Sequence, residues 1–160
     1  KADLKIRIVG SCSPEVLQSL KHNGLSDNLD NLGYQDHSQV ARYQQSAQVL
    51  LLTVNEVPSA KGIVTGKIFE YMQARRPVLA IGPTDGDLAD VIDKTRSGTI
   101  IDFGDEDGME KAIQGFYRQY KTGSLTVNSR NIEGYHRRNL TGNLLNTSSD
   151  WPPCSTRSNH

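Results

Sequence analysis

Two short apolar runs constrain the fold of this chain more than any other feature of its sequence. QVLLLTV (48–54) and PVLAI (77–81) are nearly continuous in apolar residues. Strands that are buried on both faces of a parallel sheet have this composition, because helices cover both faces. Further strand-like runs are KIRIV (5–9), LDNLGY (29–34) and GTIIDF (98–103).

Helical patterns alternate with these runs. They lie near residues 14–22, 37–47, 66–75, 86–94, 107–120 and 130–145. Alternating strands and helices with short connections predict an α/β fold with a doubly wound, Rossmann-like parallel sheet in three α/β/α layers.

Helix starts and packing faces can be predicted residue by residue. Ser13 before Pro14 is typical of a helix N-cap, and Asp105 or Asp107 can cap the helix predicted near 107–120. The three-to-four spacing of one set of residues in that helix predicts a buried stripe. The set is Ala112, Ile113, Phe116 and Tyr120.

Composition excludes several classes of protein. The chain of 160 residues carries 18 basic and 18 acidic side chains, so it lacks the basic excess of a nucleic-acid reader. No apolar run reaches the roughly 20 residues that a membrane span needs. Cys12 and Cys154 match no zinc or redox pattern. We therefore expect a cytoplasmic protein without a metal site, although one long-range disulfide would also fit the two cysteines.

The two ends of the sequence differ from the rest. KADLKIRIVG begins almost directly on a strand, from which we expect a fragment that lacks an upstream segment. TSSDWPPCSTRSNH at the other end has no periodicity and contains two adjacent prolines. The expected organisation is one domain over 1–146 and a disordered or vector-derived tail over 147–160.

The strongest candidate site follows the run at 48–54. In an open parallel sheet, ligands bind beyond the carboxyl ends of the strands, where loops lead into helices. Thr65 is suited to cap the next helix, whose first amides have no intrahelical acceptor and attract anions. Gly66 leaves the backbone accessible and Lys67 adds a cation. This arrangement predicts a phosphate site.

Glu70 extends that site along the helix. It lies three residues after Lys67, about 4.5 Å along the axis, where a carboxylate can accept hydrogen bonds from a ribose diol. The apolar neighbours Ile68, Phe69 and Met72 are expected to face the core. A simpler alternative is that Lys67 and Glu70 form a weak surface ion pair, placed by the helix dipole alone.

One segment resembles a known family. TGKIFEYMQARRPVLAIGP (65–83) is similar to the donor-binding segment of retaining glycosyltransferases with the GT-B fold, of the glycosyl transferases group 1 type. Other stretches agree in order, so that the resemblance covers residues 4–145. They are KIRIVG, NLGYQDHSQVARYQQSAQVLLLT, RSGTIIDFGDEDGMEKAI and NIEGYHRRNLTGNL.

The resemblance implies the C-terminal, nucleotide-sugar-binding half of a two-domain enzyme, whose N-terminal acceptor domain is absent from this chain. Such an enzyme transfers a sugar from a nucleoside diphosphate to a glycan or lipid-linked acceptor, in surface polysaccharide biosynthesis, without a metal cofactor. We expect this chain alone to be inactive, and the sequence leaves open whether its exposed interdomain face drives self-association. The basic cluster His136-Arg137-Arg138 is either a solvated helix face or a peripheral contact with the inner face of the cytoplasmic membrane.

The resemblance also assigns donor-binding residues, but no catalytic one. Glu70 matches the second glutamate of the family's Glu-x7-Glu motif, which binds the ribose. Its first glutamate falls at Gly62, so the contact to the donor sugar is missing or supplied differently, which leaves the sugar and the stereochemical outcome open. Gly66-Lys67 match the family's diphosphate site. Gly33-Tyr34 match the loop that contacts the nucleobase, although Tyr34 is equally interpretable as an ordinary aromatic at a strand end.

Smaller features allow two interpretations each. His37 at a helix start is expected to be solvent-exposed, with a peripheral donor contact as the alternative, and Asp87 is expected to cap a helix. Two other functions share the predicted architecture, a nucleotide-sugar epimerase and a receiver-like interaction module. A receiver-like module requires paired acids after the first strand, where this chain has GSCSPE with only Glu15.

Overall fold

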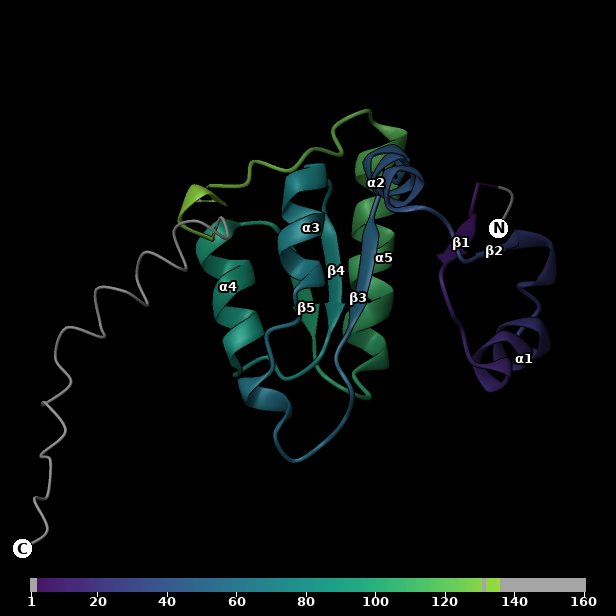
Figure 1. Cartoon of the computed structure of the whole chain (residues 1–160), viewed down its shortest axis with the longest axis horizontal. Helices are drawn as coiled ribbons and strands as arrows, with labels where there is room; N and C mark the ends of the chain where they lie inside the picture. The colour runs from purple at the N-terminus through teal and green to yellow at the C-terminus, as the bar shows by residue number, and fades with distance from the viewer. Residues whose placement is uncertain (1–2, 131, 136–160) are drawn as a thin grey trace, which may run out of the picture. The chain divides into compact units, whose positions relative to one another are not determined.

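A computed structural model of the chain describes residues 3–130 and 132–135. These residues fall into two compact units, residues 1–47 and residues 48–160, which we call the first and the second unit and describe separately. Figure 1 shows the chain coloured from its N-terminus to its C-terminus. The predicted tail over 147–160 lies outside the described residues.

The first unit is a small parallel α/β structure. Its elements are β1 (Ile6–Val9), α1 (Pro14–His22), a 3₁₀ turn (Ser26–Asn28), β2 (Leu29–Gly33) and α2 (His37–Ser46). β1 and β2 pair in parallel, with Ile6 opposite Leu29. The predicted cap at Ser13 is confirmed, because its side chain accepts a hydrogen bond from the amide of Val16 at 3.4 Å.

A charged and aromatic contact ties the elements of the first unit together. The Nε of Arg7 on β1 lies 3.1 Å from the Oδ2 of Asp30 on β2. The same guanidinium lies 5.1 Å from the centre of the Tyr43 ring on α2. Cation–π contacts of this kind contribute about 0.5–1 kcal/mol at exposed sites. Cys12, between β1 and α1, is a free thiol.

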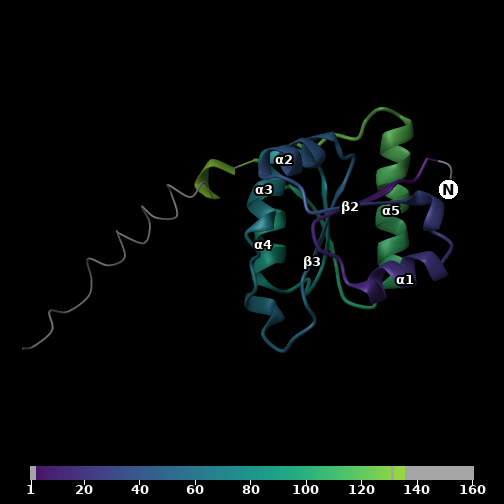
Figure 2. The same cartoon turned by 45° about the vertical axis from the view of Figure 1, so that its right-hand side comes forward.

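The second unit contains a three-stranded parallel sheet in the order β3-β4-β5. Its regular elements are β3 (Leu50–Thr53), α3 (Lys67–Ala74), β4 (Val78–Ile81), α4 (Asp87–Thr95), β5 (Gly98–Ile101) and α5 (Glu106–Lys121), with 3₁₀ turns at Ala60–Gly62 and Ile132–Tyr135. In two views, α3 and α4 lie on one face of this sheet and α5 on the other (Figures 1 and 2). The predicted α/β class and layering are therefore confirmed.

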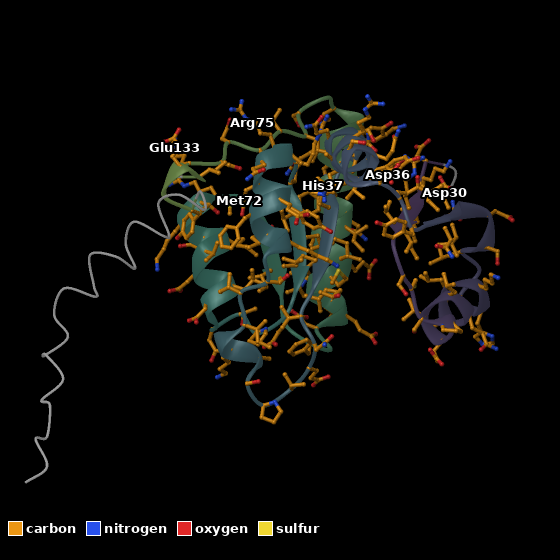
Figure 3. The ribbon with its side chains drawn as sticks, viewed as in Figure 1. Asp30, Asp36, His37, Met72, Arg75 and Glu133 are labelled. Carbon is orange, nitrogen blue, oxygen red and sulfur yellow. The ribbon has the colours of Figure 1, made fainter. Side chains whose placement is uncertain are left out.

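The core of the second unit lies between the sheet and the helices α3 and α4. Ile68 and Met72 on α3 are 0% and 1% exposed, and Leu88 on α4 is 1% exposed. Figure 3 labels Met72 on α3. The predicted inward face of α3 is therefore confirmed, with Phe69 partly buried against the same cluster.

Two predictions of burial are wrong. Leu51 on β3 is 55% exposed, although Leu50 and Leu52 beside it are buried. β3 ends the order of strands in its sheet, and α5 packs mainly against β5 at the other side. Because α5 packs mainly against this one strand, the predicted stripe on α5 is buried only in part. Ile113 and Tyr120 remain 49% and 48% exposed.

The segment after α5 returns to α3. The amide of Arg130 donates to the carbonyl of Thr95 at 2.8 Å, at the end of α4. Tyr135 then stacks on Phe69 of α3, with ring centroids 5.9 Å apart and an interplanar angle of 26°. Of the helix predicted over 130–145, the structure describes the 3₁₀ turn Ile132–Tyr135, and the remainder lies outside the described residues.

Candidate functional site

The carboxyl ends of β3, β4 and β5 lie at one edge of their sheet, because the three strands are parallel. The loops that leave these ends form a pocket of about 460 Å³, lined by residues within 56–61, 83–85 and 102–103. Ligands of open α/β sheets bind at this edge. The pocket is therefore a candidate ligand-binding site.

An ion pair joins two loops at the pocket. The Nζ of Lys61 lies 2.6 Å from the Oδ2 of Asp85. This hydrogen bond and the accompanying charge raise the pKa of Lys61, and the hydrogen bond from Lys61 lowers the pKa of Asp85. Both side chains are 67% exposed, so solvent screens the pair and it contributes little to stability.

A backbone contact joins the same loops more firmly. Gly86 is buried, and a Cβ atom at this position would lie 2.7 Å from the carbonyl oxygen of Lys61 and 3.0 Å from its Cα. Any side chain at residue 86 would therefore push the two loops apart. Gly86 is also the N-cap of α4, so the prediction that Asp87 caps this helix is wrong. Asp87 is instead the first helical residue, where its negative charge interacts favourably with the positive end of the helix dipole.

The start of α3 differs from the prediction in the residue that occupies its N-cap. Gly66 occupies the N-cap position and the helix begins at Lys67. The Oγ1 of Thr65 accepts from the amide of Lys67 at 3.3 Å, and the carbonyl of Thr65 accepts from the amide of Ile68 at 3.1 Å. Both acceptors lie outside the helix, as predicted, but the N-cap is Gly66 and not the predicted Thr65. An anion at this end of α3 would compete with Thr65 for these amides.

Gly66, Lys67 and Glu70 are exposed on the first turn of α3. None of them lines the pocket, although α3 starts from the loop that does. Glu70 affects its neighbour Tyr71, whose pKa is raised first by burial and second by the charge of this carboxylate. The hydroxyl of Tyr71 donates to the carbonyl of Leu51 at 3.3 Å. The ligand-binding roles of Gly66, Lys67 and Glu70 stay predictions.

The candidate residues of the first unit lie at the end of β2. Gly33 has φ of +62°, a conformation that favours glycine, and its carbonyl accepts from the amide of Gly10 at 2.7 Å. Tyr34 follows and is 88% exposed. His37 begins α2 with Asp36 at the N-cap, and both are labelled in Figure 3. The expected exposure of His37 is confirmed.

Metal sites and membrane-spanning helices are both absent from the described part of the chain. Within residues 3–130 and 132–135, no group of three or more histidine, cysteine or acidic side chains is arranged to hold a metal ion. In the same residues, no helix is both long and apolar enough to span a membrane. The cluster His136-Arg137-Arg138 lies outside this part.

Sequence reasoning missed the residues of the pocket. Asp85 and Asp102 each follow closely on the end of a strand, β4 and β5. Because the carboxyl ends of parallel strands meet at one edge, acids in such positions could have predicted a shared site with Lys61.

Comparison with known proteins identifies the family of the chain. Residues 1–119 match the family described as glycosyl transferases group 1, a range that contains the five strands of the described residues. The chain belongs to this family. A search of curated proteins found no match to this group 1 chain.

A solved structure supports the fold of this group 1 chain. The crystal structure of Anabaena Alr3699/HepE in complex with UDP superposes with a TM-score of 0.68 at 16% sequence identity. The superposition covers 92% of this chain and 41% of the Anabaena protein, so the chain spans less than half of that protein's length. At this identity, the likeness shows the fold alone.

Proposed function

We propose that this chain is the nucleotide-sugar-binding part of a glycosyltransferase. The observation that carries the proposal is the group 1 match over residues 1–119, which includes both the end of β2 and the start of α3. The likeness in fold to the Anabaena protein, which was solved in complex with UDP, supports it. The match favours glycosyl transfer over an epimerase or a receiver-like module.

The start of α3 is suited to the diphosphate of the donor. Lys67 is an exposed cation at the positive end of the helix dipole, and Gly66 offers backbone without a side chain. The phosphate oxygens would take over the amides that Thr65 now accepts from. Glu70 would accept hydrogen bonds from the ribose hydroxyls, and Gly33 and Tyr34 would contact the base.

The proposed reaction breaks the bond between the sugar's anomeric carbon and the β-phosphate oxygen of the donor. A new bond forms between that carbon and a hydroxyl oxygen of a glycan or lipid-linked acceptor, which gives up its proton. The nucleoside diphosphate leaves with the electron pair. Lys67 and the first amides of α3 stabilise the negative charge that develops on it, without a metal ion. We place this reaction in surface polysaccharide biosynthesis.

Calorimetric titration with UDP and with GDP tests the role of Glu70. If Glu70 holds the ribose, Glu70→Ala weakens nucleotide binding by about 1–3 kcal/mol, because charge-assisted hydrogen bonds are lost. Glu110→Ala on α5 is the control, since Glu110 is also an exposed helical glutamate but lies away from α3. Equal affinities of the wild type and Glu70→Ala would remove Glu70 from the site.

A further inference from the structure

A second pocket lies at the opposite edge of the same sheet, where β4 and β5 begin. Its volume is about 290 Å³, and it is lined by Pro77 before β4, residues 98–99 of β5, the end of α4, Phe116 of α5 and residues 126–128. We call it the amino-end pocket. None of the residues proposed to bind the nucleotide sugar lines it.

Backbone hydrogen bonds hold the outer wall of the amino-end pocket in place. The amide of Ser124 donates to the carbonyl of Gln119 at 2.9 Å, at the end of α5. The amide of Arg130 donates to the carbonyl of Thr95 at 2.8 Å, at the end of α4. The segment that carries the lining residues 126–128 is therefore attached at both ends, and the pocket does not depend on a loose loop.

The lining of the amino-end pocket combines an apolar base with a polar rim. Ile92 is 3% exposed, Pro77 is buried, and Phe116 and Val127 are half-buried. Exposed hydroxyl and amide side chains surround this base, those of Thr99, Thr126 and Asn128. Small-molecule sites have volumes of about 300–1,000 Å³, so this pocket lies at the lower limit and suits a ligand smaller than a nucleotide sugar.

Two charged side chains of opposite sign, Asp93 and Arg96, complete the lining. In the described part of the chain, neither forms an ion pair with the other or with a third group. Their charges cancel, so the pocket has no excess of either sign to attract a phosphate or a polyamine. It offers a guanidinium that can hold a carboxylate through two parallel hydrogen bonds, and a carboxylate that can accept from an ammonium group. The negative end of the α4 dipole favours the same ammonium group.

We propose that the amino-end pocket binds a free α-amino acid with an apolar side chain. Arg96 holds the carboxylate of the ligand, Asp93 accepts hydrogen bonds from its ammonium group, and its side chain covers the apolar base. This inference goes beyond glycosyl transfer and does not depend on the nucleotide role. The start of α3 lies at the other edge of the sheet, so nucleotide and amino acid can be bound together.

Amide NMR titration of the whole chain tests the chemistry of the ligand. L-Leucine is expected to shift the amides of residues 92–99 and 126–128. Three analogues each remove one feature: N-acetyl-L-leucine lacks the ammonium group, L-leucinamide lacks the carboxylate, and glycine lacks the apolar side chain. Each analogue should bind at least about tenfold more weakly than L-leucine, because a charge-assisted hydrogen bond or the burial of the apolar side chain is lost.

Matched variants test the two charged residues. Arg96→Gln and Asp93→Asn should each weaken the binding of L-leucine about tenfold. Arg75→Gln is the control for Arg96→Gln, because Arg75 is also an exposed arginine with a left-handed backbone at the end of a helix but does not line the pocket. Asp90→Asn is the control for Asp93→Asn, since both aspartates are exposed on α4. Both controls should bind L-leucine like the wild type.

The outcomes separate this inference from the proposed function. The inference is overturned if L-leucine shifts none of these amides, if N-acetyl-L-leucine and L-leucinamide bind as tightly as L-leucine, or if Arg96→Gln and Asp93→Asn bind like their controls. UDP added to the same sample tests the proposed function by itself. A chain that binds L-leucine but no UDP would support the amino-end pocket and contradict the nucleotide role.

Discussion

At the scale of single residues, two arginines adopt a backbone conformation that favours glycine. Arg75 ends α3 with φ of 54° and Arg96 ends α4 with φ of 51°, both left-handed (Figure 3 labels Arg75). For a residue with a Cβ atom this conformation costs about 1–2 kcal/mol. Arg96→Gly should therefore raise the free energy of unfolding by about 1 kcal/mol, after the larger chain entropy of glycine is subtracted. Urea unfolding followed by circular dichroism measures this change in the free energy of unfolding.

Arg118→Gly is the control for this arginine. Arg118 is an exposed residue inside α5, where glycine costs about 1 kcal/mol relative to a good helix former. The two substitutions should thus shift the urea midpoint in opposite directions. A loss of stability in Arg96→Gly equal to that of Arg118→Gly would show that the left-handed conformation carries no strain.

At the scale of elements, the pairing of β4 with β5 depends on Gly98. Gly98 lies opposite Val78 in the register, and a Cβ atom there would overlap the Val78 carbonyl. Gly98→Ala must displace β5, so we expect it to lower the free energy of unfolding by about 1–3 kcal/mol.

Gly115→Ala is the opposite case and serves as the control. A Cβ atom at Gly115 would meet nothing within 4 Å, and the residue lies inside α5. This substitution should stabilise the chain by up to about 1 kcal/mol, because alanine is the better helix former. Urea unfolding of both variants compares them directly, and a Gly98→Ala chain as stable as the wild type would refute the role assigned to Gly98.

At the scale of the whole molecule, we expect this chain to bind nucleotide without transferring sugar. Glycosyl transfer requires an acceptor hydroxyl held against the donor and a site closed to water. We propose that a partner domain supplies both. A radiolabelled donor incubated with the chain and candidate acceptors should give no labelled glycan, with the same chain shown by calorimetry to bind the nucleotide. Turnover by this chain alone would contradict the expectation.

Sequence predicted the fold better than the site, for physical reasons that particular residues show. PVLAI and QVLLLTV have similar compositions, but Val78, Leu79 and Ala80 are buried, whereas Leu51 is exposed. Apolar composition indicates a strand and does not distinguish the middle of a sheet from its edge. Local cap chemistry was predictable at Ser13 and Asp105, where the side chain bonds an amide three residues ahead.

The pocket at the carboxyl ends of β3, β4 and β5 could be predicted only from the arrangement of these strands, and not from local sequence patterns. It combines Lys61, Asp85 and Asp102, which meet only because three parallel strands end at one edge. Its close approach of Gly86 to Lys61 depends on the relative position of two loops, which short-range sequence patterns do not encode. The hydrogen bonds that Thr65 accepts at the start of α3 depend likewise on backbone geometry.

The stacking of Tyr135 on Phe69 has a consequence for how this protein should be cut and expressed. The family match ends at residue 119, yet Tyr135, beyond that limit, stacks on the helix that carries Lys67 and Glu70. The segment that matches the family is therefore shorter than the segment that packs against α3. A version trimmed to residue 119 would lose this contact with α3, and a weak ligand affinity measured on it would reflect the loss of that contact.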